Sequence, residues 1–564
     1  KPPWSTPDRP HCSGFNAEKH QVEEQASVHI FRHVAATTTV ASLWTRWRHS
    51  PPASLDRLLA AGSLECALAD LWFPARDGQA SALGALVGLS AQAAIALLTG
   101  QNQGDAAARA AVEAVLPPGP TVVTEPAPEG LRFYGLDPRS YARAAHAWQA
   151  CHPAHPAWVL GLRTAGSYLA PVVLSALAAA PVPHRCATLR PRGDPQARVL
   201  ALTPSLARAL AVWPGAFLVA DEGPGLSGSS FACVVECLTS LGVAPDRIAL
   251  LPSANPDPGN LVYPAAAAGW PRWRKFRAPG LAPPPGWRAA FNLSAGAWRA
   301  LLPAPPRTPV WGAQERLKFL SRDRRRLLKF AGFGPYGRAA LDRARALARA
   351  GWAPAADSPA DGWILYPCIP SRPVRPTAAW CEFAGAYLAW VRSNFPLGPA
   401  APPAPPLIEM LALNVERLLA APLPPALREA PAAVPVALDG RMLRQEWGAT
   451  PAGWVKFDGT DHADDPFFPG PADIAWDLAG LASEFGAAAG AAVLSAYCRR
   501  AGEAPSRLAR RLRWHRCAYL AFRAAYCRLA AAQTPAPDST WFTAASNRYR
   551  RALATNLQCR VNAR

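Results

Sequence analysis

The sequence predicts an α/β protein in which a parallel-sheet domain is followed by an α+β domain. Between residues 157 and 253, short apolar runs alternate with segments of helical spacing, the pattern of a mostly parallel sheet. After a Pro- and Arg-rich stretch, a few short strands are followed by a long region of helical periodicity. The 564 residues exceed what one hydrophobic core organises, so several domains are expected.

Composition limits the classes of partner. The formal charge of +20 at pH 7 suits anionic small substrates such as phosphates. The arginines are scattered along the chain rather than clustered, which argues against nucleic-acid binding as the main function. Only six of the 59 basic residues are lysines, which makes each lysine informative: Lys1, Lys19, Lys275, Lys318, Lys329 and Lys456.

The twelve cysteines and the apolar segments indicate a cytoplasmic protein. The cysteines form no CxxC pair and no secretory signal precedes them, so a reducing compartment is expected. Cys233 and Cys237 lie one helical turn apart, which favours a core role over a metal site. The uncharged stretch 78–104 is rich in Ala and Gly and contains Gln92, so it predicts a buried helix or helix pair rather than a membrane span. The pattern gives no oligomeric state.

The elements expected along the first half build one sheet with a helical cover. Residues 1–130 form an N-terminal, mostly helical region, or hood, that ends at the Pro-rich break 117–126. Residues 131–256 form the parallel-sheet domain. Its opening stretch gives a short strand, a turn and a helix, and residues 157–182 give a strand, a Gly-containing loop and a helix. Residues 216–253 then repeat strand, loop, helix and strand.

The stretch "AFLVADEGPGLSGSS" at 216–230 carries the strongest chemical signal. An apolar strand ends at two adjacent acids, Asp221 and Glu222, and a Gly- and Ser-rich loop runs into a helix. The backbone amides of such a loop and the helix dipole favour a phosphate guest. Because two carboxylates would repel a phosphate, they fit vicinal hydroxyls or Mg²⁺. The guest implied is a sugar phosphate.

This stretch resembles the motif that type I phosphoribosyltransferases use to bind phosphoribosyl pyrophosphate (PRPP). The resemblance implies that Asp221 and Glu222 hold the ribose hydroxyls. It also implies that Mg²⁺ and PRPP bind here. The loop that would hold the 5-phosphate consists of Gly225, Leu226, Ser227, Gly228, Ser229 and Ser230. This loop is one residue longer than the commonest form in the family.

The same family has an earlier pyrophosphate-binding loop, and "VLGLRTAGSYLA" lies where it is expected. The resemblance assigns that loop to Arg163, Thr164, Ala165 and Gly166. Arg163 would stabilise the charge on departing pyrophosphate while an acceptor attacks ribose C1. Farther on, Arg190 and Arg192 stand in a charged loop that could contact pyrophosphate or an acidic acceptor, or could be a mobile surface loop.

The second half begins after a Pro/Arg-rich linker predicted at 257–312. Residues 313–375 give two short strands, a Lys at the end of the second, a helix, a further strand and a hinge-like exit. This order resembles the small lobe of the aminoglycoside-phosphotransferase-like kinases. The resemblance implies that Lys329 grips nucleotide phosphates, with ATP as the nucleotide. The alternative is a surface lysine near a turn.

Residues 376–564 resemble the helical large lobe of the same kinases. "WVKFDGTDH" is similar to the strand that ends in a metal-binding Asp, here Asp458, and "GPADIAWDLAG" is similar to a later motif in which Asp477 positions the catalytic loop. The resemblance makes Asp439 the catalytic candidate, with Glu446 as the substitute metal ligand. The alternative is that Asp439 is not the catalytic residue. The chain departs from the family at Ala437 and Arg444, where the family has His and Asn. Nearby acids and a histidine offer further metal ligands or form a solvated loop: Asp461, His462, Asp464 and Asp465.

Together these patterns predict a two-module enzyme acting on phosphorylated small molecules. The first function is PRPP-dependent phosphoribosyl transfer to an unknown acceptor, coupled to a kinase-like module that phosphorylates the product or a related hydroxyl. The alternative is a non-catalytic sensor or scaffold that binds PRPP or a nucleotide, which the altered loop at Asp439 and the lengthened loop after Glu222 would suit.

Overall fold

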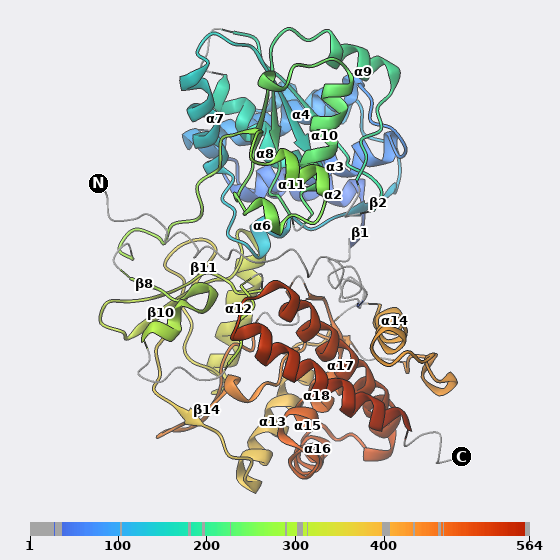
Figure 1. The fold of residues 1–564 in the computed structure, drawn as a ribbon. Coiled ribbons are helices and arrows are strands. Elements are labelled where there is room, and N and C mark those ends of the chain that lie inside the picture. The colour runs from blue at the N-terminus through green and yellow to red at the C-terminus, as the bar shows by residue number, and fades with distance from the viewer. Residues whose placement is uncertain are drawn as a thin grey trace.

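The computed structural model describes the chain in segments, drawn in Figure 1 as coloured ribbon. Both halves are mixed α/β, and the N-terminal half stands above the C-terminal half in this view. The described residues are 28, 36–101, 104–178, 182–194, 198–225, 227–287, 290–301, 308–312, 314–397, 406–432, 435–460, 464–465 and 467–558.

The N-terminal region is helical as predicted, with one added pair of strands. Strands β1 (Ala36–Thr39) and β2 (Val122–Glu125) pair antiparallel and bring the two ends of the region together. Between them lie four helices: α2 (Val40–His49), α3 (Leu55–Trp72), α4 (Ser81–Thr99) and α5 (Ala106–Glu113). The Ser54 side chain caps α3 by accepting from the Arg57 N–H.

The predicted parallel sheet is present and has five strands. They are β3 (Ala157–Leu162), β4 (Arg185–Leu189), β5 (Ala216–Ala220), β6 (Ile248–Leu251) and β7 (Arg274–Lys275). Their order in the sheet is β4-β3-β5-β6-β7, and every neighbouring pair is parallel. The chain therefore reverses its direction of strand addition between β3 and β5. Such a switch point is where open α/β sheets bind ligands.

Helices cover both faces of this sheet. They are α6 (Glu129–Arg132), α7 (Arg139–Cys151), α8 (Gly166–Leu177), α9 (Pro204–Ala211), α10 (Ser229–Ser240) and α11 (Pro264–Gly269). One-turn helix α6 stands where the sequence predicted a short strand. The N–H groups of Arg132, Phe133 and Tyr134 bond to carbonyls four residues earlier, which closes a helical turn in place of sheet pairing. Helix α4 packs against α3 and α8 and is a single helix rather than a pair.

The segment 257–312, predicted as a linker, belongs largely to the two folded bodies. Its first part supplies α11 and β7, and Trp270 is 1% exposed in the core beneath α10. Its later part supplies β8 (Phe291–Asn292), which pairs with the next sheet. Strands β7 and β8 have only two residues each, so no alternating pattern distinguishes them within a Pro-rich segment.

The C-terminal half opens with a four-stranded antiparallel sheet in the order β11-β10-β9-β8. Its other strands are β9 (Lys318–Leu320), β10 (Arg326–Phe330) and β11 (Trp363–Pro367). Helix α12 (Pro335–Arg349) connects β10 to β11. This is the order of strands and helix that the sequence predicted for 313–375. Lys329 lies one residue before the end of β10.

The last part of the chain is mostly helical, with a small sheet of β12 (Arg372–Pro373), β14 (Trp447–Thr450) and β15 (Gly453–Lys456). Shorter strands are β13 (Pro435–Val436), β16 (Asp464–Asp465), β17 (Phe468–Pro469) and β18 (Ala472–Asp473). The helices are α13 (Ala378–Asn394), α14 (Leu407–Leu419), α15 (Ala475–Phe485), α16 (Ala487–Ala501), α17 (Pro505–Gln533) and α18 (Asp538–Gln558). Helices α17 and α18 pack side by side (Figure 1).

One apolar core joins the parallel and antiparallel sheets. Its cluster contains Val159 of β3, Leu218 of β5, Leu328 of β10 and Trp363 of β11. A separate cluster fills the helical region around Trp476. The two sheets therefore share one hydrophobic core and are not independent domains joined by a linker.

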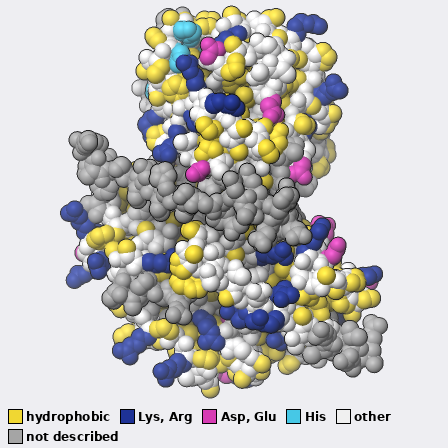
Figure 2. All heavy atoms as spheres, viewed as in Figure 1, with side chains coloured by type: hydrophobic (Ala, Val, Ile, Leu, Met, Phe, Trp, Pro, Cys, Tyr) yellow, Lys and Arg dark blue, Asp and Glu magenta, His cyan; other side chains and the backbone are white. Residues whose placement is uncertain are grey.

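The surface and one apolar helix bear on the predicted partners. Figure 2 shows Lys and Arg dispersed over the face in view rather than gathered into one stripe. Among the described residues, one helix, Ser81–Thr99, is long and apolar enough by composition to cross a membrane. Of its most apolar 18-residue stretch, 39% is buried inside the protein.

Candidate functional site

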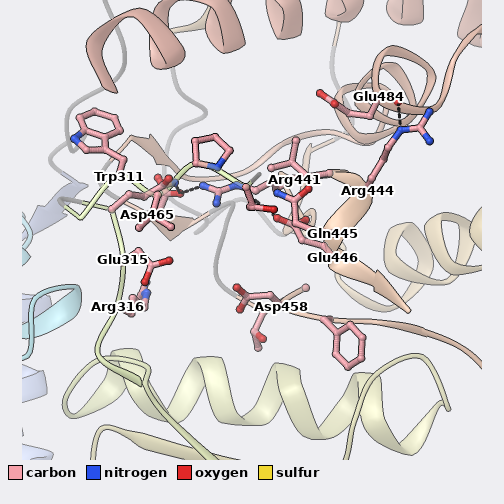
Figure 3. Close-up of a pocket in the computed structure, with 18 of the residues that line it drawn as sticks. Trp311, Glu315, Arg316, Arg441, Arg444, Gln445, Glu446, Asp458, Asp465 and Glu484 are labelled. Atoms are coloured by element: carbon pink, nitrogen blue, oxygen red, sulfur yellow. Dashed lines mark hydrogen bonds and ion pairs between the residues drawn. The ribbon is translucent and has the colours of Figure 1, made fainter. Parts of the chain in front are cut away.

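A cavity of about 1090 Å³ lies between the antiparallel sheet and the helical region (Figure 3). The sheet side contributes Lys318 and Lys329, and the exit from β11 contributes residues 366–369. The opposite side is built from residues 441–446, the segment 457–460 and helices α17 and α18. A pocket for one small ligand typically measures roughly 300–1,000 Å³. This cavity has room for a nucleotide and part of a second molecule.

Lys329 and Asp458, which the sequence assigned separately to nucleotide phosphates and to a metal, form an ion pair at this cavity. The Lys329 Nζ donates to Asp458 Oδ1, and the two residues are 129 positions apart in the chain. The Lys329 side chain is 7% exposed and that of Asp458 31%. Asp458 has φ +57°, a left-handed conformation that non-glycine residues adopt rarely and that turns its carboxylate toward the sheet. Lys329 is therefore not a surface lysine.

Asp439 is fully buried and does not line the cavity. Its Oδ2 accepts from the Tyr387 hydroxyl at 2.6 Å and pairs with the Lys456 Nζ at 3.1 Å. Burial disfavours the charged Lys456 ammonium, but Asp439 and Glu446 raise the pKa of that lysine above its usual range. In this conformation the predicted catalytic carboxylate is held by structural partners rather than offered to a substrate.

Asp477 positions the loop at Asp439, the role that the resemblance implied. Its two carboxylate oxygens accept from the backbone N–H groups of Asp439 and Gly440, each at 2.9 Å. Asp477 lies at the start of α15 and is 0% exposed. Burial, with the nearby Asp439 charge, raises the pKa of Asp477 to about 8, and the two backbone donors oppose that rise. The residue fixes the loop from within the core.

The predicted metal ligands, Asp458 and Glu446, both line the cavity and approach it from different segments (Figure 3). Glu446 Oε2 lies 3.3 Å from Lys456 Nζ, so it shares that ammonium with Asp439. Among the residues that the structure describes, no group of three or more His, Cys, Asp and Glu side chains could hold a metal ion. Mg²⁺ is ordinarily bound by one or two carboxylates together with nucleotide phosphates and waters, so Asp458 with Glu446 fits that pattern.

The remaining acids of this region divide into two groups. Asp465 is 6% exposed and accepts from the backbone N–H groups of Phe467 and Phe468 at 2.7 and 2.8 Å, so it shapes a turn. Asp461 and His462 lie outside the described residues, as does the side chain of Asp464.

The second candidate site is the acid pair at the switch point of the parallel sheet. Residues 161 and 220 are register partners, so the loops after β3 and β5 leave the sheet side by side, as predicted. Glu222 Oε2 accepts from the Gly130 N–H at 2.8 Å, and the Tyr141 hydroxyl donates to the Asp221 carbonyl at 2.6 Å. Burial raises the pKa of Asp221 to about 7 and that of Glu222 to about 8, the latter helped by the Asp221 charge.

The loop after the acids leads into α10 as the sequence predicted. Gly228 precedes the helix with φ +68°, and Ser229 is its first residue. The Ser227 and Ser229 hydroxyls lie 2.9 Å apart, and the Ser229 N–H bonds to the Ser227 hydroxyl at 3.2 Å. Gly225 and Ser230 flank this turn, whereas Leu226 lies outside the described residues.

The loop after β3 departs from its predicted role at Arg163. The Arg163 side chain is 1% exposed and pairs with Asp77 and with Asp70, which come from the N-terminal region. Its guanidinium is thus occupied by protein carboxylates, and this conformation does not present it to a pyrophosphate. Sequence reasoning placed the residue on the loop correctly but had no means to see acids some 90 positions earlier.

The rest of that loop is held tightly. Thr164 has φ +43°, and Arg190 donates to the Arg163 carbonyl at 2.8 Å and to the Thr164 hydroxyl at 3.2 Å. A Cβ on Gly166 would lie 2.3 Å from the carbonyl carbon of Gly161, so only glycine lets α8 begin this close to β3. Ala165 caps α8. Arg190 and Arg192 also pair with Asp70 and Asp77, so that loop is anchored rather than loose.

Helix α6 connects the two candidate sites. Its Gly130 donates to Glu222, while the carbonyl of Leu131 accepts from the Phe333 N–H at 3.1 Å in the loop that follows β10. The carbonyl of Arg132 accepts from Arg316, a residue that lines the cavity. Helix α6 therefore contacts both the parallel sheet and the second half of the chain.

Sequence reasoning gave no role to Arg523, which lines the cavity, or to Lys456 and Tyr387, which enclose Asp439. Lys456 carried a signal, because it is one of six lysines in an Arg-rich chain and stands two residues before Asp458. Tyr387 and Arg523 sit within long helices of ordinary composition, where no local pattern sets them apart.

Comparison with known proteins gives structural similarity without a family. No family model matches the sequence, and no curated protein matches it. Similar solved structures include a choline/ethanolamine kinase family protein from Mesorhizobium loti, which is 19% identical, covers 46% of this chain and 96% of its own, and has a TM-score of 0.31. Choline kinase LicA from Streptococcus pneumoniae is 14% identical over 43% and 89%, with a TM-score of 0.29. Macrolide 2'-phosphotransferase MphH from Brachybacterium faecium is 18% identical over 43% and 88%, with a TM-score of 0.27.

Proposed function

We propose that the cavity of the C-terminal half binds ATP with Mg²⁺ and transfers its terminal phosphoryl group to a small-molecule hydroxyl. The observation that carries this proposal is the Lys329–Asp458 pair at the wall of a cavity of about 1090 Å³. A lysine on a strand and an acid after a hairpin supply the two charges that a nucleotide and its metal require.

Each side chain has a distinct part in that activity. Lys329 binds phosphate oxygens and neutralises their charge, and Asp458 with Glu446 is the carboxylate set for the metal. When bound, Mg²⁺ screens the phosphates and polarises the transferring group. Asp477 keeps the 439–446 loop in place through two backbone bonds, so that Glu446 and Arg441 face the cavity. Positioning and charge stabilisation supply most of the catalysis in phosphoryl transfer.

Calorimetric titration with ATP and Mg²⁺ tests this function directly. We expect saturable binding that depends on Mg²⁺ and that falls about tenfold or more in Asp458→Asn, because the amide cannot neutralise the metal. Glu382 forms an exposed ion pair with Arg499, so Glu382→Gln is the matched control and should bind ATP as the parent protein does. ATP binding that is equally tight without Mg²⁺ and in Asp458→Asn would contradict the proposal.

The switch point supports a second activity, PRPP binding followed by phosphoribosyl transfer to an acceptor. The observation that favours it is the adjacency of the loops after β3 and β5, with Asp221 and Glu222 between them and the N-terminus of α10 behind. The departure at Arg163 leaves the backbone of residues 164–166 and the start of α10 as the phosphate contacts. A sensor that binds PRPP without turnover would use the same contacts.

The acid pair predicts a pH dependence for this second site. The pKa of Asp221 is raised to about 7 and that of Glu222 to about 8, so both are largely protonated at pH 6. Ionised carboxylates accept hydrogen bonds from ribose hydroxyls, so affinity for PRPP should rise from pH 6 to pH 8.5. Folding has the opposite sign, because these raised pKa values favour the folded state at low pH and that contribution is lost as pH rises through 7 and 8.

The measurement is a set of PRPP–Mg²⁺ titrations at four pH values across this range, repeated with Asp221→Asn. The variant should bind weakly and without the same pH response. Equal affinity of the parent protein at pH 6 and pH 8.5 would contradict the assignment of the acids to PRPP.

A further inference from the structure

Arg523 of α17 is a buried cation whose Nε makes no hydrogen bond in the described part of the chain. The residue is 7% exposed and lines the cavity. Burial disfavours its charge, but Tyr549 and the Glu484 carboxylate raise the pKa of Arg523 above its usual range, so it stays a cation. Its guanidinium carbon lies 4.9 Å from the ring of Tyr526 and 5.5 Å from that of Tyr549, so the aromatic rings orient the group.

The carboxylates around the cavity are committed elsewhere. Glu315 pairs with Lys318, Asp458 with Lys329, and Asp465 with Arg441. Glu484 also lines the cavity, and its Oε1 accepts the hydroxyls of Tyr519 at 2.9 Å and Tyr549 at 2.6 Å. The charge of Glu484 attracts both Arg523 and Arg548, so one carboxylate faces two guanidinium groups.

Two further arginines add to the positive charge of this wall. Arg548 of α18 lines the cavity and stacks on Tyr549, with its guanidinium carbon 4.8 Å from the ring. Arg444 also lines it, and its Nε donates to the carbonyl of Glu484 at 2.9 Å rather than to a carboxylate. The α17–α18 wall therefore carries cations in excess of acids, whereas the Lys329 wall is balanced by Asp458.

From this arrangement we infer that the phosphoryl acceptor carries an anionic group, a phosphate or a carboxylate, that binds to Arg523 and Arg548. The inference rests on the proposed phosphotransfer and names the substrate class of that site. A planar guanidinium matches the oxygens of both groups with paired hydrogen bonds. Because Lys329 lies on the sheet and Arg523 on α17, the nucleotide and the anionic end of the acceptor would occupy opposite walls of one cavity.

Packing alone does not account for Arg523. Burying a guanidinium costs desolvation even with the Glu484 carboxylate nearby, and an apolar side chain of similar volume would pack against Tyr526 and Tyr549 without that cost. Arg523 therefore suits the binding of an anionic group of the acceptor. Trp541 and Phe542 line the same wall and offer apolar contact for the rest of a small organic acceptor.

Inorganic phosphate is the probe for this site, used with the full-length protein. The non-hydrolysable ATP analogue AMP-PNP and Mg²⁺ first occupy the nucleotide position, and phosphate binding is then followed by the fluorescence of the cavity tryptophans. We expect Arg523→Met to weaken phosphate binding about tenfold or more, Arg523→Lys to recover part of it, and the surface variant Arg326→Met to leave it unchanged. Phosphate should also raise the melting temperature of the parent protein more than that of Arg523→Met.

The outcomes separate this inference from the proposed function. If AMP-PNP does not bind but phosphate binds in an Arg523-dependent way, the anion site stands and the nucleotide assignment fails. If AMP-PNP binds and phosphate binds equally well to Arg523→Met and Arg548→Met, or does not bind at all, the anion site is overturned. A lower melting temperature of Arg523→Met in the absence of phosphate would also count against it, because it would show that the guanidinium stabilises the fold.

Discussion

Replacing Lys329 by methionine is expected to weaken ATP binding by about 10- to 100-fold, since a charge-assisted hydrogen bond contributes roughly 1.5–3 kcal/mol. Methionine keeps the length and apolar stem of the side chain, so β10 should retain its pairing with β9 and β11. Asp458 would lose its ion pair with Lys329, but at 31% exposure it remains in contact with water. Titration calorimetry with ATP and Mg²⁺ measures the effect.

The matched control for this variant lies on the same strand. Arg326 is the first residue of β10, is exposed and does not line the cavity, so Arg326→Met should bind ATP as the parent protein does. If Lys329→Met and Arg326→Met bound ATP equally well, the role of Lys329 would be lost, and with it the main support for phosphotransfer. PRPP binding should be the same in both variants because the acid pair lies in the other sheet.

Replacing Lys456 by methionine is expected to give the largest loss of stability in the C-terminal half. The ammonium is fully buried between Asp439, at 3.1 Å, and Glu446, at 3.3 Å. Its removal leaves two buried carboxylates without their cation, a change that costs about 3–5 kcal/mol. For a unit of this size we expect the melting temperature to fall by roughly 10 °C. Thermal unfolding followed by circular dichroism measures this.

Two further variants show whether uncompensated charge is the cause. Adding Asp439→Asn to Lys456→Met removes one of the two stranded carboxylates, so the double variant should recover part of the lost stability. Glu382→Ala breaks an exposed pair whose side chains are 49% and 57% exposed, and it should change stability by less than about 1 kcal/mol. A Lys456→Met protein as stable as the parent would show that the three groups are not charged together.

The sequence predicted the order of elements better than their contacts. Apolar runs and Gly-rich turns located β3, β5, β6 and α10, because strand and helix periodicity are local properties of the chain. Lys329 and Asp458 were each named by resemblance rather than from local pattern, and their ion pair appears only in the structure. The burial of Arg163 against Asp70 and Asp77 could not be foreseen, since it depends on how the N-terminal helices pack on the sheet.

Short and long-range features account for what the sequence missed. Strands β7 and β8 have two residues each, too few to show an alternating pattern amid prolines. Asp439 stood in a plausible catalytic position by spacing, yet Tyr387 and Lys456 enclose it from elements 52 and 17 residues away. Arg523 lies in a long, mostly buried helix where an arginine is unremarkable until its burial and its unbonded Nε are seen in three dimensions.

The apolar core shared by the parallel and antiparallel sheets has a consequence for how this chain could be divided. A cut near residue 280 would leave Leu328, Phe330 and Trp363 on one fragment and other members of the same apolar cluster, such as Val159 and Leu218, on the other. Each fragment would then expose an apolar surface that is buried in the intact chain, so independent expression of either half should give aggregated protein. Co-expression of the two fragments should instead yield a reassembled complex, which makes split-protein complementation a natural property of this architecture.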